Sequence, residues 1–187
     1  MLNRSWRVEH ATPRHAHAIA ACHITCWREA YQGLVPDHVL AAFDIERRAQ
    51  QWQRTLRTNP ARTLLALEGS EVIGFVRAEP SRDRPPLAEI ELSALYVRAP
   101  WYGTGLAHEL LRAALDPPTG ASPAETGPSR LAADVSCSLW VFQDNPRARA
   151  FYRKHGFAPD GASRIDYFTG VTEVRMLRPA RTIGSSA

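Results

Sequence analysis

The stretch LYVRAPWYGTGLAHELL, residues 95–111, places two glycines between an apolar strand pattern and a helical pattern. The first amides of a helix have no partner within the helix, and the helix dipole adds partial positive charge there. Gly103 and Gly105 would let these amides converge without side chains in the way. We therefore expect this turn to bind a phosphate, with a tight turn that binds nothing as the alternative.

A dinucleotide-binding fingerprint, GxGxxG, does not explain these glycines. That motif needs a third glycine at position 108, where the chain has His108, and it belongs to an early strand–helix–strand unit. The two-glycine turn therefore indicates a different phosphate-bearing ligand.

A second stretch, LWVFQDNPRARAFYRKHGF (residues 139–157), pairs an asparagine with a tyrosine. Asn145 precedes Pro146 at the start of a helical pattern, which is typical of an N-cap. Tyr152 follows seven residues later, and at about 100° per residue it returns to nearly the same helix face. Asn145 and Tyr152 can therefore point toward one ligand.

The elements that must position these residues follow from hydrophobic periodicity and from Gly and Pro breakers. The predicted helices are 13–31, 36–43, 45–56, 105–115 and 146–155. The predicted strands are 6–10, 62–67, 71–78, 89–97, 138–142, 165–168 and 171–177. This order predicts an α/β (α+β) fold with a mixed, mostly antiparallel sheet of six to seven strands and helices on both faces.

The chain of 187 residues is expected to form one domain over residues 1–179. Residues 117–131, rich in Pro and Gly, are expected to be a flexible surface loop inside that domain. Residues 180–187 are expected to be a frayed tail.

Composition excludes several classes of function. The net charge is +4, and the basic residues are scattered, so we expect no nucleic-acid partner. The sequence has no apolar run of membrane-spanning length and starts without a signal-peptide pattern, so we expect a cytoplasmic protein with no membrane partner.

The three cysteines do not predict a disulfide framework or a metal site. Cys22, His23 and Cys26 lie within five residues, but a zinc site needs three or four ligands and no CxxC or HxxxH pattern accompanies them. We interpret these cysteines as buried thiols in a helix, and we expect no metal.

The first stretch resembles the acyl-CoA-binding signature of the GNAT superfamily of N-acetyltransferases. The family pattern is Gln or Arg, two residues, Gly, one residue, then Gly or Ala; here Gly105 and Ala107 match, and Tyr102 stands at the first position. The second stretch resembles the later family motif, a strand followed by Asn, a short helix carrying Phe-Tyr, and Gly-Phe. The helix around REAYQGLVPDHVL, residues 28–40, is more loosely similar to acceptor-side helices of the family.

The resemblance implies an acetyl-CoA-dependent N-acetyltransferase that acts by direct attack in a ternary complex. It implies that the amides of Gly103, Thr104, Gly105, Leu106 and Ala107 hold the CoA pyrophosphate. The strand backbone at Leu95, Tyr96 and Val97 would pair with the pantetheine arm, and Asn145 would contact that arm or adjacent backbone. Tyr152 would protonate the departing thiolate.

Acetyl transfer to an amine also needs a base, because a lysine-like ammonium titrates near about 10.4. Glu91 and Glu89 point to the same face of their strand by the period-2 rule, and that strand leads to the two-glycine turn. Glu91 is the first candidate because it lies nearer the reaction end, with action through water expected.

The acceptor is expected to be a small-molecule or peptide amine. Trp27, Tyr31 and Trp140 are candidates for its pocket, with core packing as the alternative, and Phe43 and Tyr167 are weaker candidates. The closing hairpin could supply a sheet edge for a homodimer. Two other functions remain open: transfer of a different acyl group, and a non-catalytic acyl-CoA sensor or interaction domain.

Overall fold

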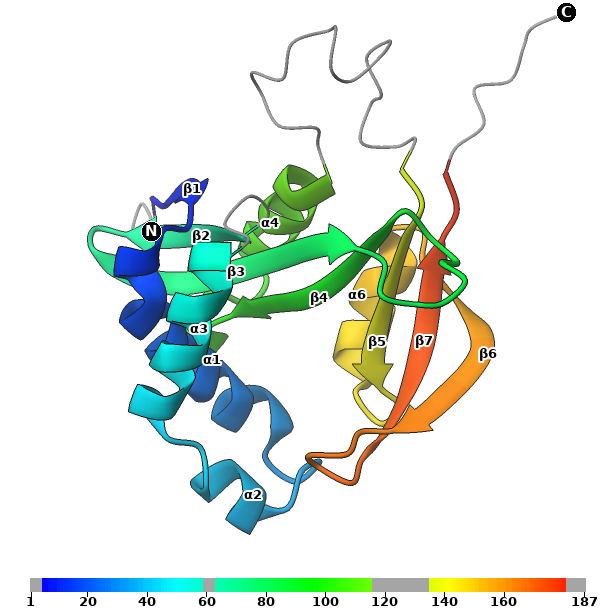
Figure 1. Cartoon of the computed structure of the whole chain (residues 1–187), viewed down its shortest axis with the longest axis horizontal. Coiled ribbons are helices and arrows are strands. Elements are labelled where there is room, and N and C mark those ends of the chain that lie inside the picture. The colour runs from blue at the N-terminus through cyan, green and yellow to red at the C-terminus, as the bar shows by residue number, and fades with distance from the viewer. Residues whose placement is uncertain (1–4, 59–62, 116–134, 181–187) are drawn as a thin grey trace, which may run out of the picture. The chain divides into compact units, whose positions relative to one another are not determined.

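The structure is a computed structural model that describes residues 5–58, 63–115 and 135–180. Within these residues seven strands form one sheet in the order β1-β2-β3-β4-β5-β7-β6 (Figure 1). The recorded β1–β2, β2–β3, β5–β7 and β6–β7 pairs are antiparallel, and β4–β5 is parallel. The predicted fold class is confirmed. The expected loop at 117–131 and residues 181–187 of the expected tail lie outside the described residues.

The element bounds agree with most of the predicted ranges to within a few residues. The strands are β1 Arg7–His10, β2 Thr63–Glu68, β3 Glu71–Pro80, β4 Ile90–Val97, β5 Cys137–Phe142, β6 Ala158–Ile165 and β7 Thr172–Arg178. The α-helices are α1 Ala16–Tyr31, α2 Asp37–Ala41, α3 Ile45–Thr58, α4 Leu106–Leu115 and α6 Pro146–Lys154. Two short 3-10 helices, η1 Pro13–His15 and η3 Ala99–Trp101, precede α1 and α4.

The chain separates into two compact units. The first unit contains Met1–Arg77 and Ala94–Ala114, and the second contains Ala78–Ser93 and Leu115–Ala187. Strands β3 and β4 each contribute residues to both units.

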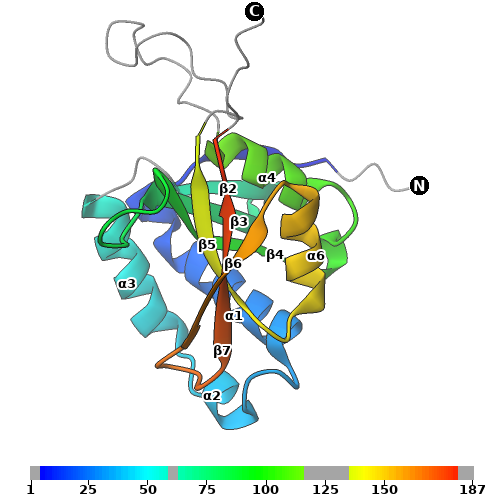
Figure 2. The same ribbon diagram turned by 90° about the vertical axis from the view of Figure 1, so that its right-hand side faces the viewer.

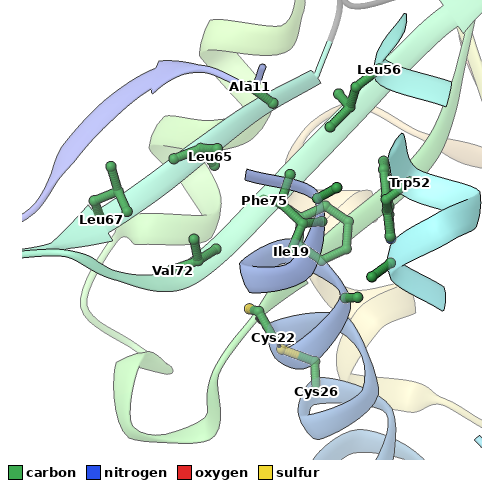
Figure 3. Packing of buried hydrophobic residues seen from close by; sticks show 13 residues of the cluster. Ala11, Ile19, Cys22, Cys26, Trp52, Leu56, Leu65, Leu67, Val72 and Phe75 are labelled. Atoms are coloured by element: carbon green, nitrogen blue, oxygen red, sulfur yellow. Dashed lines mark hydrogen bonds between the residues drawn. The ribbon is translucent and has the colours of Figure 1, made fainter. Parts of the chain in front are cut away.

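The core of the first unit forms because β2 and β3 carry apolar side chains on both faces. Leu64 to Leu67 and Val72 to Val76, apart from Gly74, are buried apolar residues, a pattern typical of strands covered on both sides. On one face Phe75 packs against Trp52 of α3, with ring centroids 5.3 Å apart, and joins the cluster that contains Ile19 of α1 (Figure 3).

The other face of β3 lies against α4. A Cβ added at Gly74 would stand 3.3 Å from Cδ1 of Leu110 in α4, and only 2.9 Å from the carbonyl oxygen of Tyr96 in β4. Real Cβ atoms essentially never approach a backbone oxygen this closely. Helices therefore cover both faces of the sheet in this unit, and β4 packs too tightly there for any residue but glycine.

In the second unit β7 lies between β5 and β6, and α6 lies against one face of these strands (Figures 1 and 2). The parallel ladder between β4 and β5 pairs Ile90 with Cys137 and Glu91 with Ser138. Strand β6 is exposed along nearly its whole length, and its register with β7 shifts between Pro159 and Ser163.

The predicted strand at 165–168 is wrong. Strand β6 runs Ala158–Ile165, and Asp166 begins a turn in which its Oδ1 accepts hydrogen bonds from the amide and the hydroxyl of Thr169 at 2.8 and 2.7 Å. The sequence APDGAS has the composition of a turn. Pairing with β7 overrides that local preference.

We predict that Gly74→Ala destabilises the protein. The new methyl group must displace the backbone of β4, and overpacking of this kind costs about 1–3 kcal/mol. Urea unfolding followed by circular dichroism would measure the change in the free energy of unfolding.

A matched control is Gly69→Asn in the turn that joins β2 to β3. Gly69 has a positive φ of 58°, a region that Asn tolerates, and a Cβ there meets nothing within 4 Å. We expect G69N to stay near wild-type stability. Equal stability of G74A and wild type would contradict the steric explanation.

Candidate functional site

The two-glycine turn has the backbone geometry that its sequence indicates. Gly103 and Gly105 are exposed and have φ values of 75° and 95°, a region that L side chains rarely adopt. A Cβ at either position would meet nothing within 4 Å. Backbone conformation, rather than crowding by the protein, is therefore what requires glycine at these two positions.

Only some amides of this turn have acceptors within the protein. The Thr104 amide donates to the carbonyl of Trp101 at 3.4 Å, and the Leu106 amide donates to the Thr104 hydroxyl at 3.5 Å. The Thr104 hydroxyl donates to the carbonyl of Trp101 at 2.8 Å, and the Glu109 amide donates to the carbonyl of Gly105 at 3.0 Å. In the part of the chain that the structure describes, no acceptor is recorded for the amides of Gly103, Gly105 and Ala107. These donors at the start of α4 are of the kind that an anion satisfies.

The strand that precedes this turn is held by β3. The Arg98 amide, directly after β4, donates to the carbonyl of Ile73 at 2.9 Å. Leu95 and Tyr96 are half-buried and Val97 is buried. The predicted pantetheine-binding backbone therefore lies in the first unit, as does the two-glycine turn.

Helix α6 in the second unit carries Tyr152, and Asn145 caps its N-terminus. The Oδ1 atom of Asn145 accepts a hydrogen bond from the Ala148 amide at 3.0 Å, which confirms the predicted N-cap. Tyr152 is buried, and its ring packs against Phe151 and Phe157 with centroid distances of 5.4 and 5.7 Å. One helix thus sets the spacing of Asn145 and Tyr152, and their binding roles remain predictions.

Glu91 is buried and held by an arginine that follows β3. The Nε atom and the amide of Arg82 donate to Oε2 of Glu91 at 3.1 and 3.2 Å, and the Arg82 Nη2 atom bonds to Oε1. Burial is the largest influence and raises the pKa of Glu91, but the bonds and charge of Arg82 together outweigh it and lower that pKa below its ordinary value. Glu91 is therefore an ionised carboxylate already bonded to a cation.

The second candidate base, Glu89, differs from Glu91 in its surroundings. The prediction that β4 begins at Glu89 is wrong by one residue, because the strand begins at Ile90 and Glu89 is exposed. The Glu89 amide donates to the Ser136 hydroxyl at 2.9 Å, and its carbonyl accepts from the Ser81 amide at 3.2 Å.

Two of the predicted acceptor residues lie together in an aromatic cluster of the first unit. The rings of Trp27 and Tyr31 are 5.0 Å apart, and Phe43 lies 4.9 Å from Trp27. The Tyr31 hydroxyl donates to the Tyr96 hydroxyl at 3.4 Å. These four side chains are half-buried, so they are neither full core nor free surface.

His23 links this cluster to the hydrophobic core. Its ring centroid lies 4.8 Å from that of Tyr96 and 5.2 Å from that of Phe75, and its Nδ1 accepts a hydrogen bond from Trp52 Nε1 at 3.3 Å. Burial, and secondarily the positive charge of Arg48, lower the pKa of His23 to about 3. His23 is therefore neutral at physiological pH, with its proton on Nε2.

The third predicted acceptor residue, Trp140, belongs to the second unit and lies beneath two arginines. The Arg164 and Arg175 guanidinium carbons lie 4.1 and 5.4 Å from its ring centroid. Arg175 is also bonded to Asp160 at 2.7 Å and to Asp83 at 3.2 Å. The face of Trp140 is therefore already occupied by cations.

The cysteines behave as packing residues. Cys22 and Cys26 are buried in the core with their sulfur atoms 3.9 Å apart, and Cys137 is buried in β5. Among the described residues, no group of three or more His, Cys, Asp or Glu side chains is placed to hold a metal ion. In these same residues no helix has the length and hydropathy that crossing a bilayer requires.

The sequence matches known proteins over most of its length. Residues 25–157 match the Acetyltransferase (GNAT) family. A probable N-acetyltransferase of Mycobacterium tuberculosis is 26% identical over 157 residues, 83% of this chain and 81% of that protein. An uncharacterized N-acetyltransferase of Mycobacterium bovis is 30% identical over 129 residues, 68% of this chain and 72% of that protein.

Solved structures share the fold at lower identity. A PaiA N-acetyltransferase from Thermoplasma acidophilum, solved in complex with coenzyme A, matches with a TM-score of 0.63 and 17% identity, covering 94% of this chain and 99% of that chain. A protein from Pyrococcus horikoshii matches with a TM-score of 0.66 and 18% identity, covering 95% of this chain and 100% of that chain. Both sequence relatives carry names of N-acetyltransferases, and the solved structures show the same fold. The chain belongs to the GNAT acetyltransferase family.

Sequence reasoning missed the residues that surround the candidate carboxylate and the aromatic cluster. Arg82 lies in PSRDRPP, between the predicted strands 71–78 and 89–97, yet it binds Glu91. The short connection from β3 to β4 was the available signal, because it returns residues after β3 to the start of β4. Arg48 could not be identified in this way, because nothing in the sequence distinguishes it from the other three arginines of α3.

We predict that Arg82→Gln destabilises the protein in a pH-dependent way. The pKa of Glu91 is depressed in the folded state, so the pair stabilises fully above the ordinary value of 4.5 and loses its effect as pH falls through the lower folded pKa. Removing the partner leaves a buried carboxylate, which costs roughly 1–2 kcal/mol near neutral pH, and this cost shrinks as the pH falls below the ordinary pKa. Urea unfolding at neutral pH and at successively lower pH values would measure the difference from wild type.

The control for this experiment is Arg153→Gln on α6. Arg153 is exposed and carries no ion pair among the described residues, so we expect a change below about 0.5 kcal/mol without the same pH dependence. A difference between R82Q and wild type that is constant with pH would contradict the role assigned to the pair.

We predict that Asn145→Ala lowers the free energy of unfolding by about 1 kcal/mol through loss of the N-cap. Asn145→Ser should recover most of this loss, because its hydroxyl oxygen can still accept the Ala148 hydrogen bond. Measuring coenzyme A affinity of both variants would separate capping from binding. Wild-type stability of N145A would show that the cap is unimportant.

Proposed function

We propose that this chain transfers an acetyl group from acetyl-CoA to a primary amine by direct attack in a ternary complex. The observation that carries the proposal is the two-glycine turn, whose amides at Gly103, Gly105 and Ala107 have no recorded acceptor among the described residues. Membership of the GNAT family supports it, as does the coenzyme A complex of the similar Thermoplasma protein.

This proposal assigns three groups of residues to the coenzyme. The amides from Gly103 to Ala107 bind the pyrophosphate, and the backbone of Leu95 to Val97 pairs with the pantetheine arm. Asn145 contacts the pantetheine or adjacent backbone. The exposure of Gly103 and Gly105, with open space where a Cβ would be, supports the fit of a phosphate to this turn.

In this reaction we assign the role of general acid to Tyr152 and the role of general base to a carboxylate. The Tyr152 hydroxyl protonates the departing thiolate, so the leaving group departs as a neutral thiol. The amine must lose a proton before attack, either to a carboxylate or to water. Arg82 makes Glu91 a weaker base than an unpaired carboxylate, because catalysis by a base falls as its pKa drops below the working pH. Glu89, which is exposed, remains the second candidate.

Two alternatives keep the same coenzyme site. One is a transferase of another acyl group, and the other is a non-catalytic acyl-CoA sensor. A turnover assay with acetyl-CoA against small amines, polyamines, aminoglycosides and peptides separates them. Coenzyme A that raises the melting temperature, combined with no turnover on any acceptor, would favour the sensor.

We predict that Tyr152→Phe reduces kcat by about 10²–10⁴-fold, because a positioned acid contributes that much to catalysis. Coenzyme A affinity should stay near the wild-type value, since the ring and its packing against Phe151 and Phe157 are kept. Steady-state kinetics and calorimetric titration with coenzyme A would measure the two quantities.

The control is Ser163→Ala on β6, which removes the hydroxyl of an exposed residue that has no role in the proposed site. We expect its kcat to equal that of wild type. Undiminished turnover by Y152F would remove the acid role from Tyr152 and leave the transfer reaction itself in place.

A further inference from the structure

Arg48 of α3 is a half-buried cation for which the described residues provide no carboxylate partner. Its guanidinium carbon lies 5.4 Å from the ring centroid of Phe43, and the residues that the structure describes provide it with no ion pair and no side-chain hydrogen bond. Arg98 of the same unit, also half-buried, shows the usual arrangement. It bonds to Glu29 at 3.1 Å and to Glu71 at 3.3 Å.

A partly desolvated charge without a counter-charge is unfavourable, and burial accordingly lowers the pKa of Arg48. The contact with Phe43 compensates for part of this cost, because an aromatic face attracts a cation. The guanidinium still presents several N–H donors without a recorded acceptor, so this position is prepared for an anion.

The groups near Arg48 add donors rather than negative charge. The charge of Arg48 acts on both His23 and Tyr96. Because Nδ1 of the neutral His23 accepts from Trp52, the other ring nitrogen is a donor. An ammonium group would therefore be repelled at this position, whereas a carboxylate would be bound.

The side chains next to Arg48 form an aromatic cluster. Trp27, Tyr31, Phe43 and Tyr96 form the half-buried cluster described above, and Arg48 lies over one of its rings. Tyr96 also belongs to the strand segment assigned to the pantetheine arm, so its backbone and its ring connect the proposed coenzyme strand to the cluster. An aromatic or apolar part of a ligand would pack against these rings.

We propose that the acceptor is an amine whose molecule also carries a carboxylate and an aromatic or apolar body, and that Arg48 binds that carboxylate beside His23 and the cluster of Trp27, Tyr31, Phe43 and Tyr96. The assignment of this ligand as the acceptor rests on the proposed transferase function. A single guanidinium with aromatic walls suits a planar carboxylate, which it can bind through two parallel N–H bonds.

The test uses two ligands of the same shape, hydrocinnamate and its uncharged amide, hydrocinnamamide, titrated calorimetrically into the full chain. Wild type should bind the carboxylate about ten- to a hundred-fold more tightly than the amide, the range expected for hydrogen bonds to a charged group. Arg48→Gln should reduce the affinity for hydrocinnamate to that for the amide and leave the amide affinity unchanged. Arg48→Lys, which keeps the charge but not the paired donors, should fall between the two.

Two further variants locate the effect. Arg57→Gln, on the same helix at an exposed position without a recorded partner, should bind both ligands as wild type does. Phe43→Leu should weaken both ligands by the same factor, because it removes an aromatic wall and no charge. Unchanged amide binding by R48Q would also show that this variant is folded.

The inference is overturned if wild type binds the two ligands equally, if it binds neither, or if R48Q keeps the preference for the carboxylate. Neither ligand carries an amine, and neither titration needs acetyl-CoA. An active transferase that ignores both ligands would therefore overturn the inference alone. A chain that binds hydrocinnamate through Arg48 but acetylates no amine would overturn the proposed function and leave an anion site.

Discussion

The close approach of β3 and β4 at Gly74 fixes the position of the strand on which the first unit's candidate residues depend. With no side chain at position 74, the Tyr96 carbonyl oxygen lies only 2.9 Å from where a Cβ would be. Val97 of β4 and Leu110 of α4 also lie beside Gly74, and the Tyr96 ring lies 4.8 Å from that of His23. The chain then passes through η3 into the two-glycine turn, so backbone sterics at one residue influence both the proposed coenzyme strand and the proposed acceptor cluster.

Three arginines of this protein differ in whether a carboxylate is bonded to them. Arg98 and Arg82 are neutralised by carboxylates, and the Arg82 pair lowers the pKa of Glu91 although burial alone would raise it. Arg48 has no such partner among the described residues and lies against an aromatic ring. The paired arginines connect loops and strands, whereas Arg48 carries a charge that no carboxylate among the described residues balances. This contrast separates a structural cation from a candidate binding group.

Much of this fold could be predicted because local and global preferences agree. The apolar runs at β2 and β3, the turn at Gly69 and the Asn145-Pro146 helix start each carry a signal that the folded chain uses directly. The two glycines were identifiable for the same reason, since their positive φ values leave few other residues possible. Strand β6 was predicted in the wrong place because its pairing with β7 outweighs a sequence with turn composition.

The surroundings of the candidate groups could not be predicted in the same way. The contact between Arg82 and Glu91 depends on the path of a loop, and the place of Trp140 beneath Arg164 and Arg175 depends on strand register. Both are tertiary facts without a periodic signature. The period-2 rule predicts that Glu89 and Glu91 share a face of the strand. Glu89 instead lies just before β4 and is exposed, whereas Glu91 lies within β4 and is buried.

The irregular pairing of β6 has a consequence for how copies of this protein meet in concentrated solution. An outer strand that is exposed and regular offers a continuous template for further strands, which leads to aggregation. Here the register shift between Pro159 and Ser163, the missing amide hydrogen of Pro159 and the positive φ of Gly161 interrupt that template. Open-ended stacking of chains through this edge is thereby disfavoured, although the strand itself remains accessible to solvent.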